Sequence, residues 1–502
     1  MRVTETKVDS LAHRTVRNVA WLGSGQAIRQ VVAMLTMVVL ARHLGPSEFG
    51  MFAMAMFVNE LAQLVVDFGI GSALIQRKEI NRLELSSCFW INVAVAAMAA
   101  VILIAAGPVI ADYFKQPMVR WLMFATAINL LISAMAVLPQ ALLARRLAFR
   151  DIAVGTLVGS LSGAATAIVL ALAGAGVWAL ACQPVVGSSV TLLFLAARAG
   201  WLPDFRFQLA AINGLLKFSG QLLLSNLVAY VTRSLPILIL GPAMGVATLG
   251  LINMAYTIAW LPVAQFSQTV VKATFPVFAQ LQNDMDRFRE GFYRATGLVA
   301  LFAFPLMMGI AVLAEELVPV VFGPKWAPAS KLVPIACVPA LLLSVTTLAG
   351  TVLLATGRAD LLLRITLLNL PTTALFLWAT RTGSASLAMA ALAVAMVISS
   401  LISLVAATHT IGAEWKRYAA SVAVPAACSA AMAALIYLAK GALPGAPPTV
   451  RLIGFSIAGA AFYLSAVWLV KRAAIEDLIN LVMRRPSAGH SRGLDESSAG
   501  TL

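Results

Sequence analysis

The sequence FGMFAMAMFVNELAQLVVDFGIGSALIQRK (residues 49–78) decides the fold. It follows a Gly45-Pro46 turn and is apolar as far as Ile75, apart from four positions, Asn59, Glu60, Gln63 and Asp67. An α-helix of this length spans a bilayer at 1.5 Å per residue. A carboxylate at the centre of a membrane helix costs at least about 2.5 kcal/mol, so Glu60 and Asp67 are expected to face a polar cavity or a cationic partner. The stretch therefore predicts a membrane helix beside an aqueous path.

The composition of the whole chain is that of an integral membrane protein. Of its 502 residues, 61% are hydrophobic and 11% are charged, whereas soluble domains average about 45–50% apolar and 25% charged residues. The apolar runs have the length of helices and lack the alternation of β-barrel strands. We therefore predict an all-α polytopic membrane protein. The four cysteines lie singly in apolar runs and the four histidines are scattered, so neither a metal site nor a cofactor is predicted.

Apolar windows of about 20 residues predict fourteen spans and an uncleaved first span. The fifth and sixth spans touch at Gly174-Ala175-Gly176, and the ninth is short. The predicted spans lie near 16–41, 49–75, 85–106, 119–143, 152–173, 177–197, 215–240, 246–271, 296–313, 332–355, 361–379, 385–408, 418–439 and 451–470.

The distribution of lysine and arginine supports an even number of spans. If the N-terminus is cytosolic, the cytosolic loops and span ends hold 26 of the 36 Lys and Arg residues, the outer ones hold eight, and Arg29 and Arg233 lie inside spans. This asymmetry follows the positive-inside rule and places both termini in the cytosol. The net charge of +15 therefore reflects topology and contact with anionic lipid headgroups, and no nucleic-acid partner is predicted.

An internal repeat divides the chain into two halves. Leu44-Gly45-Pro46 and the run from Gly50 have echoes in Leu240-Gly241-Pro242 and the run from Gly250, six spans later. Because six is even, both halves enter the membrane in the same direction, and a transport site is expected between them. The predicted parts are an N-lobe (1–197), a cytosolic linker (198–214), a C-lobe (215–408), two further helices (409–470) and a disordered cytosolic tail (471–502).

Two charged segments outside the spans are interpreted as structural. The stretch 272–294 repeats phenylalanine and other apolar residues every three or four positions, which favours an amphipathic helix on the cytosolic interface over a partner-docking site. The pair Asp284 and Asp286 falls on its solvated face. Glu315-Glu316 is expected to be an exposed carboxylate pair at a helix end. The sequence has no Walker glycine loop and no long outer loop, so an enzyme is not predicted.

Charges inside the spans are the candidate site. Arg29 lies about 20 Å into the first span, Arg233 lies well inside the seventh, and Glu60 and Asp67 lie in the second. These residues either pair with one another and lock the helices, or serve transport. We predict that Arg29 and Arg233, each on the first helix of its lobe, bind an anionic phosphate headgroup. Glu60 and Asp67 are candidates for coupling cation entry to transport.

Three motifs carry a family resemblance over essentially the whole chain. The motifs are DFGIGSALIQRKEINRLELSSCFWINV (67–93), FPVFAQLQNDMDRFREGFYR (275–294) and PVVFGPKW (319–326). The sequence resembles the Wzx-type flippases of lipid-linked oligosaccharides, in the colanic-acid-exporter-like branch of the multidrug/oligosaccharidyl-lipid/polysaccharide superfamily. The resemblance implies two six-helix lobes in a V, two extra C-terminal helices and a cationic central cavity. Arg29 and Arg233 match that cavity by residue type and helix, not residue by residue.

The predicted function is secondary transport in the bacterial inner membrane. The resemblance implies that an undecaprenyl-diphosphate-linked oligosaccharide repeat unit is flipped from the cytosolic to the periplasmic leaflet for polysaccharide export. The expected partners are this lipid-linked glycan, membrane lipid, and a polysaccharide polymerase with its chain-length regulator. Two alternatives stay open: a cation-coupled multidrug exporter of the same superfamily, which two cavity arginines disfavour, and a membrane polysaccharide polymerase or ligase, which the lack of a large outer loop disfavours.

Overall fold

Long helices form the whole of the described structure. The computed structural model describes residues 2–66, 81–205, 216–442 and 445–470, and this part of the chain contains no strand. Thirteen of its helices are long and apolar enough to span a membrane. Each of them corresponds to one of the fourteen predicted spans. The remaining predicted span, 49–75, is described only as far as Val66 as helix α2, because its last residues and Asp67 lie outside the described residues.

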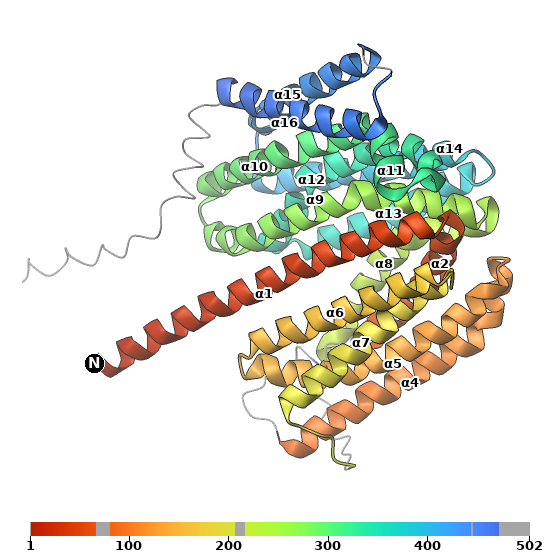
Figure 1. The fold of residues 1–502 in the computed structure, drawn as a ribbon. Coiled ribbons are helices and arrows are strands. Elements are labelled where there is room, and N and C mark those ends of the chain that lie inside the picture. The colour runs from red at the N-terminus through yellow and green to blue at the C-terminus, as the bar shows by residue number, and fades with distance from the viewer. Residues whose placement is uncertain (1, 67–80, 206–215, 443–444, 471–502) are drawn as a thin grey trace, which may run out of the picture.

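The first six long helices form an N-terminal group and the next six a C-terminal group (Figure 1). The N-terminal group comprises α1 (Arg2–His43), α2 (Pro46–Val66), α4 (Arg82–Tyr113), α5 (Pro117–Arg145), α6 (Phe149–Leu172) and α7 (Trp178–Ala199). The C-terminal group comprises α8 (Leu216–Met244), α9 (Val246–Leu281), α10 (Met285–Val312), α12 (Val333–Ala355), α13 (Ala359–Thr380) and α14 (Ala385–Ile411). In Figure 1 the groups meet at the right of the view and spread apart toward the left, as the two lobes of a V. The fold class predicted from the sequence is therefore confirmed.

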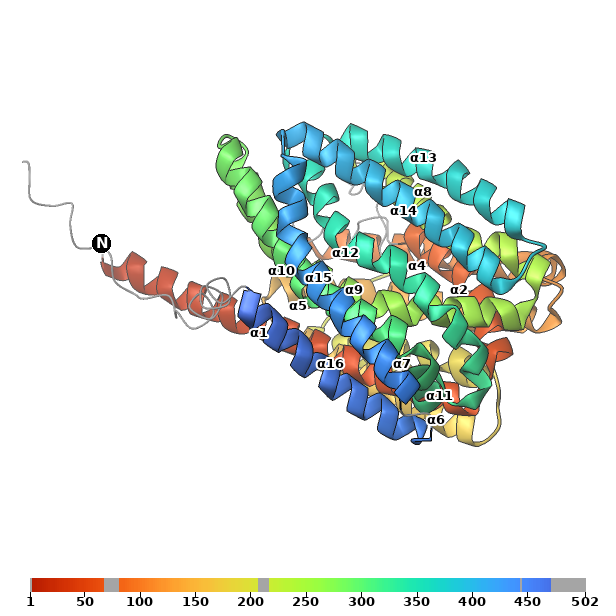
Figure 2. The same cartoon turned by 90° about the horizontal axis from the view of Figure 1, so that it is seen from above.

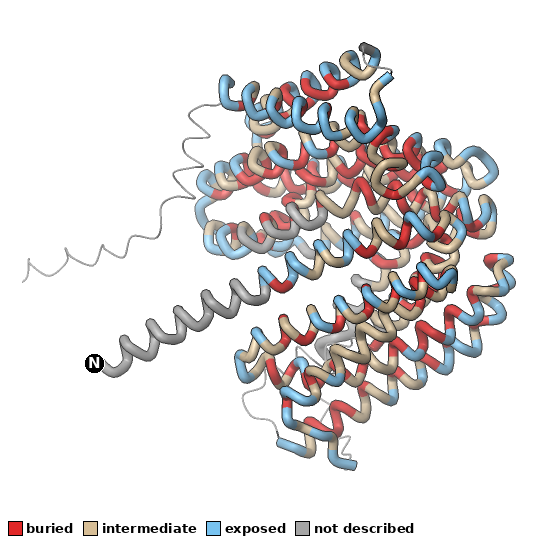
Figure 3. Tube along the Cα trace, viewed as in Figure 1, coloured by how far each residue is buried: buried red, intermediate tan, exposed pale blue. Residues whose placement is uncertain are grey.

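Two more long helices, α15 (Trp415–Ala442) and α16 (Pro448–Val470), pack on the outside of the C-terminal group. Figure 2 shows them crossing over α10 and α11 (Ala314–Phe322). Large apolar side chains on the outer faces, such as Val109, Leu193 and Leu469, are more than 60% exposed. Buried residues instead follow the faces where helices meet (Figure 3). Apolar outer faces of this kind suit a protein whose solvent is lipid.

The internal repeat coincides with a two-fold crossing between α2 and α9. A side-chain carbon on Gly50 would lie 2.1 Å from the carbonyl oxygen of Val246, and one on Gly250 would lie 1.9 Å from that of Pro46. Each helix thus approaches the backbone of the other at an equivalent glycine. Because Pro242 lies inside α8, the equivalent of Gly45-Pro46 is Gly245-Val246. Gly245 has φ +83°, a conformation that glycine adopts without strain.

The prediction of a separate interfacial helix at 272–294 is wrong. Helix α9 continues to Leu281, α10 starts at Met285, and the two form a helical hairpin that extends both spans. Its apolar face is buried inside the protein: Phe278 stacks on Phe288 with ring centres 4.8 Å apart, and Phe292 stacks on Tyr418 of α15 at 5.7 Å. The amphipathic pattern therefore marks burial against protein. The predicted ninth span looked short because the first turns of α10 carry surface ion pairs.

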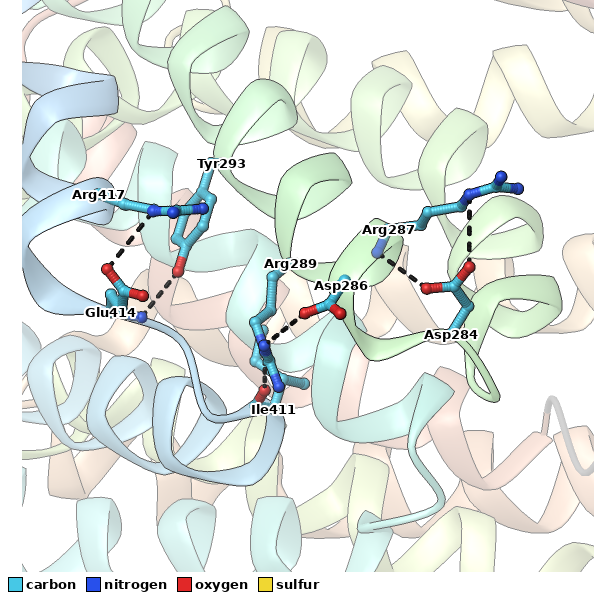
Figure 4. Close-up of polar contacts among 8 residues, drawn as sticks. All are labelled: Asp284, Asp286, Arg287, Arg289, Tyr293, Ile411, Glu414 and Arg417. Atoms are coloured by element: carbon cyan, nitrogen blue, oxygen red, sulfur yellow. Dashed lines mark hydrogen bonds and ion pairs between the residues drawn. The ribbon is translucent and has the colours of Figure 1, made fainter.

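Polar contacts fasten the start of α10 to the α14–α15 turn (Figure 4). Asp284 caps α10 by accepting from the Arg287 amide at 3.2 Å. Asp286 binds Arg289, whose Nε donates to the Ile411 carbonyl at 2.7 Å. The Tyr293 hydroxyl accepts from the Glu414 amide at 2.7 Å. Both aspartates are solvent-exposed, as predicted, and both also have structural roles.

The prediction of an exposed Glu315-Glu316 pair is wrong for Glu316. Its side chain is 1% exposed and lies 2.9 Å from the Lys440 ammonium of α15, while it also binds Arg451 of α16. Glu315 is exposed, and its distance from Lys440 is longer, at 3.6 Å. The two adjacent carboxylates differ because only Glu316 is enclosed between α11, α15 and α16. Glu316 therefore ties these two helices to the C-terminal group.

Candidate functional site

A central cavity of about 800 Å³ lies between the two helix groups. Residues from α1, α2 and α7 line one side, and residues from α8, α9, α13 and α14 line the other. Among the described lining residues, the only charged side chains are Glu60 and Arg233. Tyr256 and Trp260 of α9 stack with ring centres 5.6 Å apart on its wall. The cavity is thus mostly apolar with a few polar groups, as is usual for ligand sites.

Arg233 is held in this cavity by two neighbours. Its Nη2 atom lies 3.3 Å from the Glu60 carboxylate of α2, and its guanidinium carbon lies 5.4 Å from the centre of the Tyr230 ring. Tyr230 is three residues earlier on α8, so both side chains occupy one helix face. That ring stacks on Phe57, and its hydroxyl donates to the Phe57 carbonyl at 2.6 Å. The guanidinium and the carboxylate nevertheless stay accessible, with exposed side-chain fractions of 61% and 49%.

Arg29 lines a second, smaller pocket of about 480 Å³ inside the N-terminal group. We call this pocket the N-lobe groove. It lies between α1, α2, α5, α6 and α7, and the Arg29 guanidinium donates to the side chain of Gln26 on the same helix. The groove and the central cavity share four lining residues, Ala33, Phe52, Met56 and Gln183. The two spaces therefore adjoin one another.

The structure places the predicted site residues in two connected pockets. Arg29 faces the N-lobe groove, Arg233 faces the central cavity, and Glu60 pairs with Arg233. The pairing agrees with the helix-locking alternative for Glu60. Asp67 lies outside the described residues. The roles of these residues in substrate binding and ion coupling stay predictions.

Sequence reasoning missed the uncharged part of the site. Tyr230 precedes Arg233 by about one helical turn, and this spacing could have indicated that the tyrosine lies beside the arginine. Gln140 and Gln183 line the N-lobe groove, and amides inside apolar spans could have been treated as Glu60 was. The described residues contain no group of three or more His, Cys, Asp or Glu side chains that could hold a metal ion.

A latch joins the two helix groups at the end where α1 and α2 meet. We use this name for Arg42, Lys325 and Trp326 with the carbonyl groups that they bind. Arg42 donates to Val320 and Val321 of α11, and Lys325 donates to the His43 carbonyl at 2.9 Å. Trp326, which is fully buried, donates to the Ala41 carbonyl at 2.8 Å. Lys325 and Trp326 lie in the 3₁₀ helix η2 (Pro324–Lys331).

Known proteins resemble this chain in sequence and in fold. A family model described as polysaccharide biosynthesis protein matches residues 39–331. Lipopolysaccharide biosynthesis protein WzxC of Escherichia coli (strain K12) is 28% identical over 431 residues, which cover 83% of this chain and 85% of that protein. Succinoglycan biosynthesis transport protein ExoT of Rhizobium meliloti (strain 1021) is 29% identical over 316 residues, 63% of this chain and 64% of that protein.

The same helix arrangement occurs in a solved structure of the lipid II flippase MurJ in an inward closed conformation. The two structures superpose with a TM-score of 0.74 over 90% of this chain and 99% of that one, at 12% sequence identity. At this identity the likeness concerns the fold alone.

Proposed function

Because the chain belongs to the polysaccharide biosynthesis protein family, whose model matches residues 39–331, we propose that it flips a polyprenyl-diphosphate-linked oligosaccharide repeat unit across the bacterial inner membrane. The names of two relatives support polysaccharide biosynthesis and transport, and the fold is shared with a lipid II flippase. The repeat unit moves from the cytosolic to the periplasmic leaflet, where a polymerase and its chain-length regulator act on it. Both termini of the chain lie in the cytosol.

One observation carries this proposal: two guanidinium groups face adjoining pockets at membrane depth. Among the described residues that line the two pockets, the charged side chains are two arginines, Arg29 and Arg233, and one carboxylate, Glu60. A cavity with an excess of positive charge suits a diphosphate, whose oxygens accept charge-assisted hydrogen bonds from arginine. Arg233 makes one ion pair, leaving further N–H groups for a ligand.

Flipping of such a substrate proceeds without ATP. Moving one negative charge out of an inside-negative cell releases about 2.3 kcal/mol per 100 mV, and a diphosphate carries up to two charges. In this proposal the latch lies at the periplasmic end, and its release is the step that exposes the site to that side. The protein acts as a transporter and catalyses no covalent step.

A gene deletion with analysis of the lipid carrier tests this function. A flippase deletion is expected to abolish surface polysaccharide and to accumulate single lipid-linked repeat units in the cytosolic leaflet, both reversed by a plasmid copy. A polymerase deletion would instead leave repeat units in the periplasmic leaflet. A multidrug exporter would change sensitivity to cationic dyes and leave the polysaccharide intact.

A further inference from the structure

The side chains that line the N-lobe groove suit a neutral ligand that is rich in hydroxyl groups. Its polar lining is made of hydroxyls and amides, including Thr36, Gln140, Thr156, Gln183, Ser188 and Thr191. Arg29 is the only charged side chain among the described residues that line it. Thr156 and Ala164 both line the groove and are eight residues apart on α6, which corresponds to about 12 Å of helix. The groove is therefore elongated, has both polar and apolar lining residues, and is nearly free of charge.

Two amides in this groove have no hydrogen-bond partner among the described residues. The hydroxyls of Thr36, Thr156 and Thr191 donate to carbonyls of their own helices, and Ser188 donates to Asn129 at 2.9 Å. Gln140 and Gln183 have no such contact, although each carries two donors and an acceptor. Gln183 is half-buried whereas Gln140 is exposed, and a half-buried amide without a partner is unfavourable unless a ligand or water binds it. Gln183 therefore marks where a ligand would bind, and Gln140 offers a second, accessible amide in the same groove.

The wall of the groove that α6 and α7 form is fixed by close packing of these two helices. A side-chain carbon on Gly159 would lie 2.5 Å from the Gly187 carbonyl oxygen, and one on Gly163 would lie 2.5 Å from that of Gln183. The two backbones are thus in direct contact along the groove. A rigid wall holds Gln183 in position before the ligand arrives, which lowers the entropic cost of binding.

We propose that the N-lobe groove binds the sugar residues next to the diphosphate of the lipid-linked substrate. The inference rests on the proposed function and adds a glycan subsite to it. Sugar hydroxyls both donate and accept hydrogen bonds, as the free amides of Gln140 and Gln183 do. Arg29 stands at the same groove, so a diphosphate bound there places its first sugars among these amides. Gln183 also lines the central cavity, and the glycan continues past it.

Paired lipid ligands test this subsite on the purified full-length protein. The probes are the lipid-linked glycan that accumulates in the deletion strain and the polyprenyl diphosphate left after its glycan is hydrolysed off. We expect the wild type to bind the glycosylated lipid at least about tenfold more tightly. Gln140→Leu and Gln183→Leu, which remove the amide at nearly constant size, should each reduce this preference about twofold to tenfold. Affinity for the bare diphosphate should stay within twofold of wild type.

Gln280→Leu is the matched control, because it makes the same change at an exposed residue of α9 outside both pockets. If the leucine variants do not fold, as judged by melting temperature, Gln140→Asn and Gln183→Asn withdraw the same amides by about 1.5 Å and should lose the same preference. Equal binding of the two lipids by the wild type, or an unchanged preference in the double variant, would overturn the glycan subsite and leave the flippase function standing. Failure of the wild type to bind either lipid would overturn both.

Discussion

At Arg233 the protein keeps a cation available at membrane depth by giving it only weak partners. The Glu60 carboxylate is close, at 3.3 Å, but both side chains are about half exposed to the cavity. Exposed ion pairs contribute about 0–1 kcal/mol, since water screens them and ordering both side chains costs entropy. The Tyr230 ring adds a cation–π contact of similar size. A diphosphate, which carries more charge than one carboxylate, can therefore displace Glu60.

Removing either arginine should weaken binding of the lipid-linked substrate. Charge-assisted hydrogen bonds contribute about 1.5–3 kcal/mol each, so Arg29→Ala or Arg233→Ala should lower the affinity about tenfold to a hundredfold. Lysine keeps the charge but lacks the planar fork, and should restore only part of the activity. The measurement is complementation of a flippase-null strain, scored by surface polysaccharide at matched membrane levels. Arg120→Ala, an exposed arginine outside both pockets, is the control. Normal export by an Arg29→Ala, Arg233→Ala double variant would contradict the arginine site.

Neutralising Glu60 should have the opposite effect on binding. Glu60→Gln removes the carboxylate that competes for Arg233, so affinity for polyprenyl diphosphate should rise up to about fivefold, the equivalent of about 1 kcal/mol. The melting temperature should change little, because the pair is accessible to water. Titration with polyprenyl diphosphate measures the affinity, and Glu290→Gln, which breaks a surface pair with Arg294, is the control. Weaker binding in Glu60→Gln would mean that this carboxylate helps to hold the substrate. Loss of a dependence of export on the pH gradient would assign Glu60 to proton coupling.

At the scale of helices, contacts at two places hold the two six-helix groups and the last two helices together. The crossing of α2 and α9 joins the two groups through backbone contacts at Gly50 and Gly250. The buried Glu316 joins α15 and α16 to the C-terminal group through Lys440 and Arg451. In a membrane, small residues allow close helix approach, and buried charges persist only where they are paired. These contacts are therefore expected to be sensitive to small substitutions.

A single methyl group at the α2–α9 crossing should destabilise the described conformation. Gly250→Ala places a carbon 1.9 Å from the Pro46 carbonyl oxygen, so the helices must separate, at a cost of about 1–3 kcal/mol. The melting temperature of the detergent-purified protein should fall. Gly350→Ala is the control, because this helical glycine of α12 has open space at its side-chain position. An equal change in the two variants would show that the crossing does not hold the groups together.

Neutralising the buried carboxylate of α11 should loosen the last two helices. Glu316→Gln leaves Arg451 without its charge partner and leaves Lys440 with only the exposed Glu315; breaking a buried ion pair typically costs about 3–5 kcal/mol. We expect a lower melting temperature and faster proteolysis at the α15–α16 connection. Glu315→Gln is the neighbouring control, since this carboxylate is 71% exposed and 3.6 Å from Lys440. Similar stability of the two variants would remove Glu316 from this anchoring role.

For the whole molecule, hydropathy predicted the helices but not which side chains meet. The spans were predictable because lipid excludes unpaired backbone groups, which makes long apolar runs helical. The sequence also indicated the short turn between two spans by its two glycines, and both Gly174 and Gly176 have positive φ. The Arg233–Glu60 pair joins helices 173 residues apart in sequence, and no local pattern encodes such a distance. For the same reason the amphipathic pattern that contains Phe278 and Phe292 predicted a helix on the membrane interface, although these side chains are buried against protein.

The lysine and arginine distribution predicts which end of the V faces the cytosol, and three reporter fusions test this orientation. In Figure 1, α1 begins and α16 ends at the left of the view, where the α9–α10 turn also lies. An even number of spans puts both termini on one side of the membrane, and the lysine and arginine excess predicts that this side is the cytosol. Fusions after Asp284 and at Arg472 should therefore give fluorescent protein signal and no alkaline phosphatase activity. A fusion at Gly445, between α15 and α16, should give the reverse. Signals from one side at Arg472 and Gly445 would exclude the even count at the C-terminal end. Reversal of all three signals would invert the protein, and the latch would then close the cytosolic end of the transport path.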